Sequence, residues 1–364
     1  MDRKRLAFLL PDMGGGGAER VALTLIKHLI AEGHSVDLVL MQARGELLPL
    51  LPSQVNVINL GAGRIRDAVW PIAEYLARAK PAAMQISMWP LTVAGVVARM
   101  LARADTRIVV SDHAALSKEY AGRGFWHRQM LKWSMRLFYP RADARVVVAA
   151  ATANDLSQLS GLAQWTFEVV HNPVEAPGWS TVDPDVERMW GSARYRILNV
   201  GRLDPQKNQQ LLLESFARVA TSHDAKLIIL GEGTLRQQLE QRATELGIAD
   251  RVIMPGFRLE PAPFYRSANL FVLSSDFEGY PLVLIEAMHC GLSVASTDCP
   301  TGPGEILNGG EFGNFAPCGD SLKLAEAMAA ALDHPTDPEK LKRRAQNLSA
   351  QAADRYLQLL TGDR

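Results

Sequence analysis

Strand-length apolar runs alternate with segments of helical periodicity along almost the whole chain, and this alternation constrains the fold more than any other feature. Strands separated by helices are typical of a parallel α/β sheet, because the chain needs a long crossover to return to a parallel neighbour. In the first half the expected strands are 6–10, 36–41, 107–110 and 144–149, and a long helix is expected at 18–31.

The second half repeats the pattern after a proline-bearing stretch without periodicity. Expected strands are 195–200, 226–230, 252–254, 270–273 and 293–296, and expected helices are 208–220, 235–246 and 281–289. With 364 residues, 48% of them hydrophobic, the chain is long for a single core. We therefore predict two Rossmann-like domains, at 1–175 and 195–345, with a linker at 176–194 and a helical tail at 346–364.

Composition narrows the function classes. The chain has 39 acidic and 39 basic residues, so no overall field favours nucleic acid. Its three cysteines are too few and too scattered for a disulfide framework, and no CxxC or HExxH pattern predicts a metal site. The longest apolar windows are too short for a signal peptide or a membrane span. We expect a cytoplasmic enzyme without a bound metal.

Two glutamates eight positions apart in the segment 277–288, FEGYPLVLIEAM, are difficult to explain by core packing. Pro281 fits the first turn of a helix, where its missing N–H is no loss, and free amides such as that of Leu282 form a site for an anion. Glu278 then lies at the mouth of that site and Glu286 about one and a half turns into the helix. Two carboxylates so placed suit the hydroxyls at the two ends of a nucleotide sugar.

This segment resembles the E-x7-E signature of retaining glycosyltransferases of family 4, which have the GT-B fold. Further segments agree, densely from 199 to 307 and more loosely before: GGGGAE at 14–19, SDH at 111–113, HNPVE at 171–175, NVGRLDPQKNQQLLLESF at 199–216, LGEGTLRQQLE at 230–240, PGF at 255–257 and DCPTGPGEIL at 298–307. The resemblance implies two Rossmann-like domains facing each other across a cleft, with the last helix returning to the first domain. Bacterial lipid-linked oligosaccharide and surface polysaccharide enzymes are the implied relatives.

The resemblance also implies roles for individual residues. It assigns the donor to Gly15, Gly16, Gly201, Arg202, Lys207, Gly231, Gly233, Phe257, Arg258, Glu278, Gly279, Tyr280, Leu282 and Glu286, and catalysis to His113, Arg202, Lys207 and Glu278. Glu278 is implied to hold donor-sugar hydroxyls, and Glu286 the ribose hydroxyls. One departure concerns Gly304, where many relatives have a basic residue.

The glycine run 14–17 follows the first expected strand and opens a helix. A dinucleotide site would need an acidic residue at the end of the second strand, about 20 residues on. Asp37 lies inside that strand instead, which disfavours an NAD enzyme. A plain tight turn stays an alternative to the donor-phosphate loop that the resemblance implies.

Arg202 and Lys207 follow a strand on a loop that leads into a helix, where a solvated pair is the simplest interpretation. Departure of a nucleoside diphosphate, however, develops negative charge that cations must neutralise. His113 also follows a strand, and a structural histidine is the alternative to the family histidine that faces the donor sugar. Asp112 beside it is expected to orient the ring or to bond the acceptor.

The segment 122–140 carries Arg128, Lys132 and Arg136 at i, i+4 and i+8, which predicts one basic stripe on a helix. A second, broad surface of the same segment is formed by seven bulky apolar residues, namely Phe125, Trp126, Leu131, Trp133, Met135, Leu137 and Phe138. A contact with anionic lipid is one interpretation, and a core helix with a solvated face is the other. The resemblance implies a contact of this helix with the pyrophosphate of a lipid-linked acceptor.

The resemblance, together with these observations, implies metal-independent, retaining transfer of a sugar from a nucleotide donor to a hydroxyl of a lipid-linked or growing cell-surface glycan. A UDP-sugar is expected over a GDP-sugar, on resemblance alone, and the expected location is cytoplasmic, with the inner membrane surface as a partner. A nucleotide-sugar epimerase of the same fold and a catalytically silent sugar-nucleotide-binding partner of another transferase are the alternatives.

Overall fold

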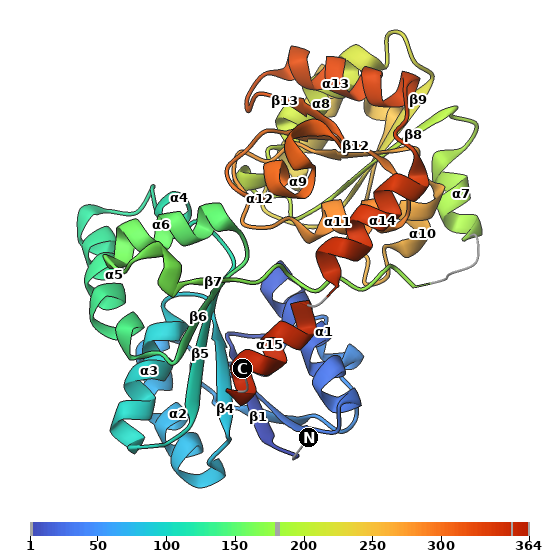
Figure 1. The fold of residues 1–364 in the computed structure, drawn as a ribbon. Helices are drawn as coiled ribbons and strands as arrows, with labels where there is room; N and C mark the ends of the chain where they lie inside the picture. Colours follow the sequence, from blue (N-terminus) through green and yellow to red (C-terminus); the bar gives the residue numbers. More distant parts are fainter. Residues whose placement is uncertain (1–2, 179–182, 351, 363–364) are drawn as a thin grey trace. The chain divides into compact units, whose positions relative to one another are not determined.

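A computed structural model describes residues 3–178, 183–350 and 352–362. The chain folds into two compact units, each an α/β sheet covered by helices (Figure 1). Unit 1 comprises 1–173 and 349–364, and unit 2 comprises 174–348. All strand pairs in both sheets are parallel, which confirms the predicted fold class of two Rossmann-like domains.

Unit 1 is built on a seven-stranded sheet of order β3-β2-β1-β4-β5-β6-β7. Its central strands are buried on both faces, and this explains why they read as continuous apolar runs. The strands are β1 Arg5–Leu10, β2 Ser35–Leu40, β3 Asn56–Asn59, β4 Ala83–Ser87, β5 Arg107–Asp112, β6 Ala144–Val147 and β7 Glu168–Val169. The helices are α1 Gly17–Ala31, α2 Ile65–Ala79, α3 Leu91–Ala102, α4 Leu116–Glu119, α5 Phe125–Phe138, α6 Ala150–Ser160 and α15 Ala352–Thr361, with 3-10 turns η1 Leu48–Leu50, η2 Tyr139–Arg141 and η3 Gln164–Thr166.

Unit 2 is built on a six-stranded sheet of order β10-β9-β8-β11-β12-β13. Its strands are β8 Tyr195–Val200, β9 Ala225–Leu230, β10 Val252–Gly256, β11 Leu270–Leu273, β12 Ser293–Thr297 and β13 Asn314–Ala316. Its helices are α7 Pro184–Trp190, α8 Gln209–Val219, α9 Arg236–Glu245, α10 Ala262–Ser267, α11 Leu282–His289, α12 Gly302–Ile306, α13 Ser321–Asp333 and α14 Pro338–Ser349, with 3-10 turns η4 Pro205–Lys207, η5 Ala249–Arg251 and η6 Asn308–Gly310.

The chain crosses between the units twice, and both crossings have packed structure beside them. Within the stretch expected as a linker, α7 buries Trp190 completely, and the Trp190 indole N–H donates to Ser267 Oγ at 2.8 Å. After the second crossing, α15 lies against α1 and strands β4 and β5 of unit 1 (Figure 1). Arg107 Nε donates to the Leu359 carbonyl at 2.7 Å, and Tyr356 is fully buried. The tail is thus an integral layer of unit 1.

Candidate active site

The sheet of unit 2 reverses its strand order between β8 and β11, and ligands of open α/β sheets bind beside the carboxyl ends of strands at such a point. The loops that leave these two strands are held together by several hydrogen bonds. The Asp276 amide donates to the Gln206 carbonyl at 2.9 Å, and Gln206 Nε2 donates to the Phe277 carbonyl at 2.9 Å. Ser274 Oγ donates to the Lys207 carbonyl at 2.8 Å. The two loops therefore form one ordered edge.

Lys207 and Glu278 meet at this edge. Lys207 Nζ lies 2.6 Å from Glu278 Oε1, and the two side chains are only 19% and 6% exposed. Ser275 Oγ donates to the same oxygen at 2.6 Å. A buried ion pair costs desolvation energy that its own attraction only partly returns, so it is weak evidence for stability and is more readily explained by a role. The pair supplies one fixed cation and one fixed carboxylate.

The side chain of Arg202 is much more exposed than that of Lys207. Its side chain is 69% exposed, and Nε lies 3.2 Å from Asp204 Oδ2. Its backbone is fixed, because Gln209 Nε2 donates to the Arg202 carbonyl at 2.9 Å. The structure therefore offers a second cation on an anchored backbone whose side chain is able to turn toward an anion.

Glycine is required where the loops of unit 2 stack on each other. At Gly231, where φ is +145°, a Cβ would lie 1.9 Å from the Gly201 carbonyl oxygen. A Cβ on Gly233 would lie 2.4 Å from the Leu203 carbonyl oxygen. Phe257 and Arg258 follow directly after β10, at the same edge of the sheet. Glycine allows the backbones of these loops to pack closely, and the absence of side chains also allows a ligand to approach the backbone.

The loop after β12 supports the backbone around Glu278, a contact that the sequence interpretation missed. Thr301 Oγ1 lies 2.9 Å from the carbonyl oxygens of both Glu278 and Gly279. A Cβ on Gly302 would lie 2.6 Å from the Gly279 carbonyl oxygen and 2.8 Å from the Tyr280 Cα. Helix α11 begins at Leu282, one residue later than predicted, because Pro281 has an extended conformation and caps the helix instead of joining it. By contrast, a Cβ on Gly304 would meet only Asp298 Oδ1, at 3.8 Å.

Glu286 lies on α11, where its Oε2 accepts a hydrogen bond from the Tyr265 hydroxyl at 2.7 Å. Tyr265 is fully buried on α10 and its ring lies beside Phe271. The Glu286 side chain is thus held from one side by a neutral partner, whereas Glu278 is held by a cation. The two carboxylates of the motif have different electrostatic surroundings.

The glycine loop of unit 1 follows β1, at the point where this sheet also reverses its strand order, between β1 and β4. Gly15 has a φ of +83°, and Gly16 caps α1. The Gly14 amide donates to Asp12 Oδ1 at 3.1 Å. A Cβ on Gly16 would lie 2.5 Å from Glu19 Oε2, so the turn is tight at this residue.

His113 and Asp112 lie at the end of β5 with different partners. His113 Nε2 lies 3.1 Å from Ser111 Oγ, and burial lowers the pKa of the ring to about 4, so it is neutral at pH 7. Asp112 is 1% exposed and accepts a hydrogen bond from the Tyr139 hydroxyl at 2.6 Å. Burial raises the pKa of Asp112 to about 7. Ser111, which sequence reasoning did not single out, contacts the ring, whereas Asp112 is bonded to Tyr139.

Helix α5 carries the basic residues, with Arg128 and Arg136 exposed and Lys132 partly buried. Its apolar residues divide in a way that periodicity did not predict. Of the seven that the sequence grouped together, Leu131 and Met135 are buried and Phe138 is half-buried, while the exposed ones are Phe125, Trp126, Trp133 and Leu137. The helix is therefore neither a plain core helix nor a simple amphipathic one.

Among the described residues, no group of three or more His, Cys, Asp or Glu side chains is arranged to hold a metal ion. No helix within the described ranges is both long enough and apolar enough to cross a bilayer.

Comparison with known proteins identifies both units. Residues 15–176 match the family model of glycosyltransferase family 4, and residues 189–348 match that of glycosyl transferases group 1. A Campylobacter jejuni N-acetylgalactosamine-N,N'-diacetylbacillosaminyl-diphospho-undecaprenol 4-alpha-N-acetylgalactosaminyltransferase is 26% identical over 94% of this chain and 93% of its own. An amylovoran biosynthesis glycosyltransferase of Erwinia amylovora is 27% identical over 80% of each.

The solved structure of Anabaena HepE with UDP-glucose has the same fold, with a TM-score of 0.76 at 21% identity, covering 99% of this chain and 98% of that one. The chain therefore belongs to the glycosyltransferases, with a family 4 domain followed by a group 1 domain. Its fold is GT-B.

Proposed function

We propose that this glycosyltransferase moves a sugar from a nucleotide donor, a UDP-sugar, to a hydroxyl of a lipid-linked or growing cell-surface glycan, with retention of anomeric configuration. The observation that carries the proposal is the direct contact of Lys207 with Glu278 at the strand-order reversal of unit 2. One cation and one carboxylate held together suit a ligand with a diphosphate at one end and sugar hydroxyls at the other.

The chemistry proposed for Lys207 and Arg202 is stabilisation of the leaving diphosphate. Negative charge grows on that group as the glycosidic bond breaks, and preorganised donors aimed at it lower the barrier. Lys207 is already fixed by Glu278, whereas Arg202 turns toward the phosphates from its anchored backbone. The amides at the start of α11, such as that of Leu282, add to this, because the first turn of a helix leaves N–H groups unpaired. In this proposal the reaction proceeds without a metal.

Glu278 is proposed to accept hydrogen bonds from hydroxyls of the donor sugar, and Glu286 from those of the ribose. No carboxylate acts as a covalent nucleophile in this scheme. A phosphate oxygen of the leaving group takes the proton of the acceptor hydroxyl on the face from which it departs, which retains configuration. Backbone groups at Gly231, Gly233, Phe257 and Arg258 are proposed to hold the base, and the loop at Gly15 and Gly16 to cover the phosphates.

His113 is proposed to contact the donor sugar as a neutral ring, because burial keeps its pKa near 4. The acceptor is proposed to meet unit 1. Its phosphates pair with the basic stripe, Arg128, Lys132 and Arg136, at the inner surface of the membrane. Asp112 is proposed to form a hydrogen bond with the acceptor. One relative favours such an acceptor, since the name of the C. jejuni enzyme specifies a diphospho-undecaprenol substrate. The HepE complexes with UDP and UDP-glucose favour a UDP donor.

The proposal is tested by incubating the purified protein with a panel of nucleotide sugars and a polyprenyl-diphosphate-linked saccharide. The expected result is a lengthened lipid-linked product whose new linkage keeps the donor's anomeric configuration, read by NMR. Appearance of an epimerised sugar without transfer identifies an epimerase. Binding of the donor with neither reaction in the presence of acceptor identifies a silent binding protein. Lys207→Met is the matched control for donor-dependent turnover.

A further inference from the structure

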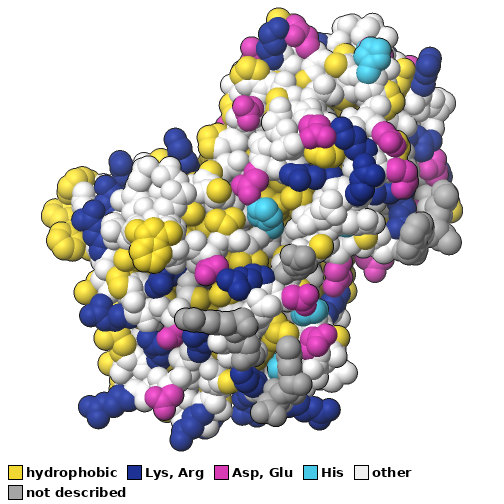
Figure 2. Space-filling model, in the orientation of Figure 1, with side chains coloured by type: hydrophobic (Ala, Val, Ile, Leu, Met, Phe, Trp, Pro, Cys, Tyr) yellow, Lys and Arg dark blue, Asp and Glu magenta, His cyan; other side chains and the backbone are white. Residues whose placement is uncertain are grey.

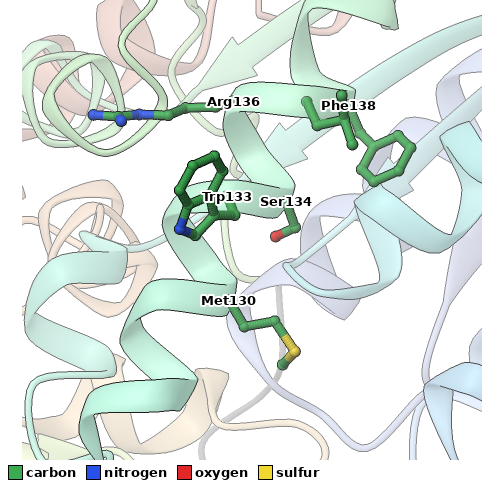
Figure 3. A pocket seen from close by; sticks show the side chains of 6 residues that line it. Met130, Trp133, Ser134, Arg136 and Phe138 are labelled. Carbon is green, nitrogen blue, oxygen red and sulfur yellow. The ribbon is translucent and has the colours of Figure 1, made fainter.

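Helix α5 exposes a line of large apolar side chains to solvent. Trp126 is 82% exposed, Met130 54%, Trp133 69% and Leu137 52%. These four residues, named here the apolar stripe, recur at i, i+4, i+7 and i+11 and therefore lie along one face of the helix. Figure 3 shows Met130 and Trp133 on successive turns of α5. Single exposed apolar residues are ordinary, but a continuous line of four marks an interaction surface.

The apolar stripe and the basic stripe occupy different faces of α5. At roughly 100° per residue, their centres are about 130° apart around the helix. The buried residues Leu131 and Met135 lie between the two on the other side, against the rest of the unit. The side chain of Arg136 extends away from Phe138 in Figure 3. Helix α5 therefore presents one apolar face and one cationic face.

The charge of the surroundings favours an anionic partner. Between Glu119 and Asp143 the sequence contains five cations and no carboxylate, namely Arg123, Arg128, Lys132, Arg136 and Arg141. Figure 2 shows Lys and Arg side chains beside hydrophobic ones on the side of unit 1 where Figure 1 draws α5. A second copy of the chain docked on this face would bring like charges together, which disfavours a dimer through α5.

The apolar stripe also borders a hollow. A depression of about 500 Å³ is lined by Met130, Trp133, Ser134, Arg136, Leu137 and Phe138, all on the same helix (Figure 3). Trp favours the boundary between lipid headgroups and acyl chains, because its ring is apolar while its N–H forms hydrogen bonds with water or headgroups. A hollow with mainly apolar walls between such residues accommodates part of an acyl chain.

We propose that the apolar stripe of α5 inserts into the headgroup–acyl boundary of an anionic lipid bilayer, while the basic stripe pairs with lipid phosphates. The proposal deepens the proposed function, on which it rests for the lipid-linked nature of the acceptor. It adds an attachment surface made of aromatic and aliphatic side chains, distinct from the cations. Membrane attachment then places unit 1 where a lipid-linked acceptor is presented.

The test compares three variants of the full chain by co-sedimentation with phosphatidylcholine vesicles, with and without phosphatidylglycerol. The stripe variant is W126Q/M130Q/W133Q/L137Q, and the basic variant is R128Q/K132Q/R136Q. The matched control is W70Q/W165Q, since Trp70 and Trp165 are 71% and 85% exposed elsewhere in unit 1. All the apolar positions changed are more than half exposed, so the fold should be retained, and circular dichroism checks this.

The wild type and the control should bind anionic vesicles equally. The stripe variant should bind roughly 100-fold more weakly to both kinds of vesicle, because burial of large apolar side chains is lost. The affinity of the basic variant for anionic vesicles should fall about fivefold for each cation removed. This variant should therefore lose the preference for anionic vesicles, and its binding should no longer depend on salt. Lipids brominated in the acyl chain should quench wild-type tryptophan fluorescence, and this quenching should be lost in W126Q/W133Q.

Vesicle binding and transfer are separate readouts, so failure of the proposed function is distinguishable from failure of this inference. A protein that binds vesicles through α5 but transfers no sugar contradicts only the former. Equal vesicle binding by the wild type and the stripe variant overturns the inference. The inference is also overturned if the wild type does not bind vesicles and is dimeric by light scattering, while the stripe variant is monomeric. The apolar stripe would then be a subunit interface. Donor hydrolysis without acceptor should be the same in the wild type and the stripe variant.

Discussion

At the carboxyl edge of the unit 2 sheet, Lys207 and Glu278 carry opposite charges and bond directly, whereas at the same edge of unit 1 His113 and Asp112 lie among neutral partners. Burial lowers the pKa of His113 and raises that of Asp112, so it favours the neutral form of both. One sheet edge thus carries a fixed pair of charges, and the other limits charge. Changing the groups on each side should have different consequences.

The largest effect is expected at the ion pair. Lys207→Met leaves the Glu278 carboxylate buried without its cation, which should cost about 3–5 kcal/mol of unfolding free energy. Turnover should fall by at least about a hundredfold, because the diphosphate loses a fixed donor. Unfolding in urea and steady-state kinetics measure the two effects.

The double variant K207M/E278Q separates the roles of the pair. Removing both charges should recover most of the lost stability, since no unpaired charge remains buried, while activity should stay lost. If the double variant is as unstable as Lys207→Met alone, the coupling of these two side chains has been overestimated.

Asp112 should make stability depend on pH. Its folded pKa of about 7 lies above the ordinary value of 3.8, so the folded state holds this proton more tightly than the unfolded chain does. The contribution is fully present below about pH 4 and is lost as the pH rises through 7, by an amount on the order of 4 kcal/mol. Asp112→Asn should remove this loss. Urea unfolding of the wild type and Asp112→Asn from pH 4 to 8 measures this difference. If the unfolding free energies of the two proteins change with pH in parallel, Asp112 does not titrate in this range.

His113 should act in the opposite direction. Its folded pKa of about 4 lies below the ordinary 6.5, so its contribution is present above pH 6.5 and is lost as the pH falls toward 4. The curve for His113→Asn should therefore converge on that of the wild type toward acid pH, whereas Asp112→Asn diverges toward alkaline pH. NMR titration of the His113 ring gives its pKa directly.

Arg202 and Glu286 should separate turnover from donor binding. Arg202→Ala should lower kcat by roughly 10²–10³ and change stability by less than about 0.5 kcal/mol, because the side chain is 69% exposed. Glu286→Ala should chiefly raise KM, since contacts with ribose are the same in the ground and transition states. A raised KM with unchanged kcat in Arg202→Ala contradicts its role toward the leaving group.

A smaller effect is expected from the tail. The Tyr356 hydroxyl lies 3.4 Å from Ser111 Oγ, which in turn contacts the His113 ring. Tyr356→Phe removes one buried hydroxyl and should cost about 1 kcal/mol of stability and less than tenfold in kcat. Its specific signature is a shifted His113 pKa by NMR. Ser160→Ala, also a buried hydroxyl in unit 1, should cost similar stability without moving that pKa.

The smallest effect is expected from chelation, because the proposal gives the diphosphate charge to Arg202, Lys207 and helix amides. Activity in EDTA should stay within about twofold of the untreated enzyme. Complete loss in EDTA that Mn²⁺ restores would show that a metal takes part.

Much of the fold followed from the sequence, because buried parallel strands read as apolar runs. The sequence did not predict strands β3, β4 and β7 of unit 1 or β13 of unit 2. Strands β4 and β3 were missed for different reasons. The buried strand β4 contains Gln85 and Ser87, which interrupt its apolar run. The edge strand β3 has no fully buried residue and so shows no burial pattern. Neither pattern distinguishes a strand from a loop.

The candidate site was also predictable from the sequence only in part. The motifs pointed to Lys207 and Glu278, but their direct bond joins residues 71 positions apart and depends on the order of β8 and β11. Thr301 and Ser111 lie within the segments 298–307 and 111–113 that carry the resemblance, but the sequence assigned neither residue a role, because their contacts depend on how the loops pack. On α5, periodicity identified the basic stripe but could not tell which apolar face is buried, since that depends on the neighbouring helices.

Donor binding at the Lys207–Glu278 edge is tested most directly by thermal unfolding of the wild type and Lys207→Met with a panel of UDP- and GDP-sugars. A ligand at about 100 times its Kd stabilises a protein by about 2.7 kcal/mol, which raises the melting temperature by a few degrees. We expect such a rise for the wild type with a UDP-sugar and a much smaller one for Lys207→Met. Equal stabilisation of both proteins, or of neither by any nucleotide sugar, would contradict this expectation.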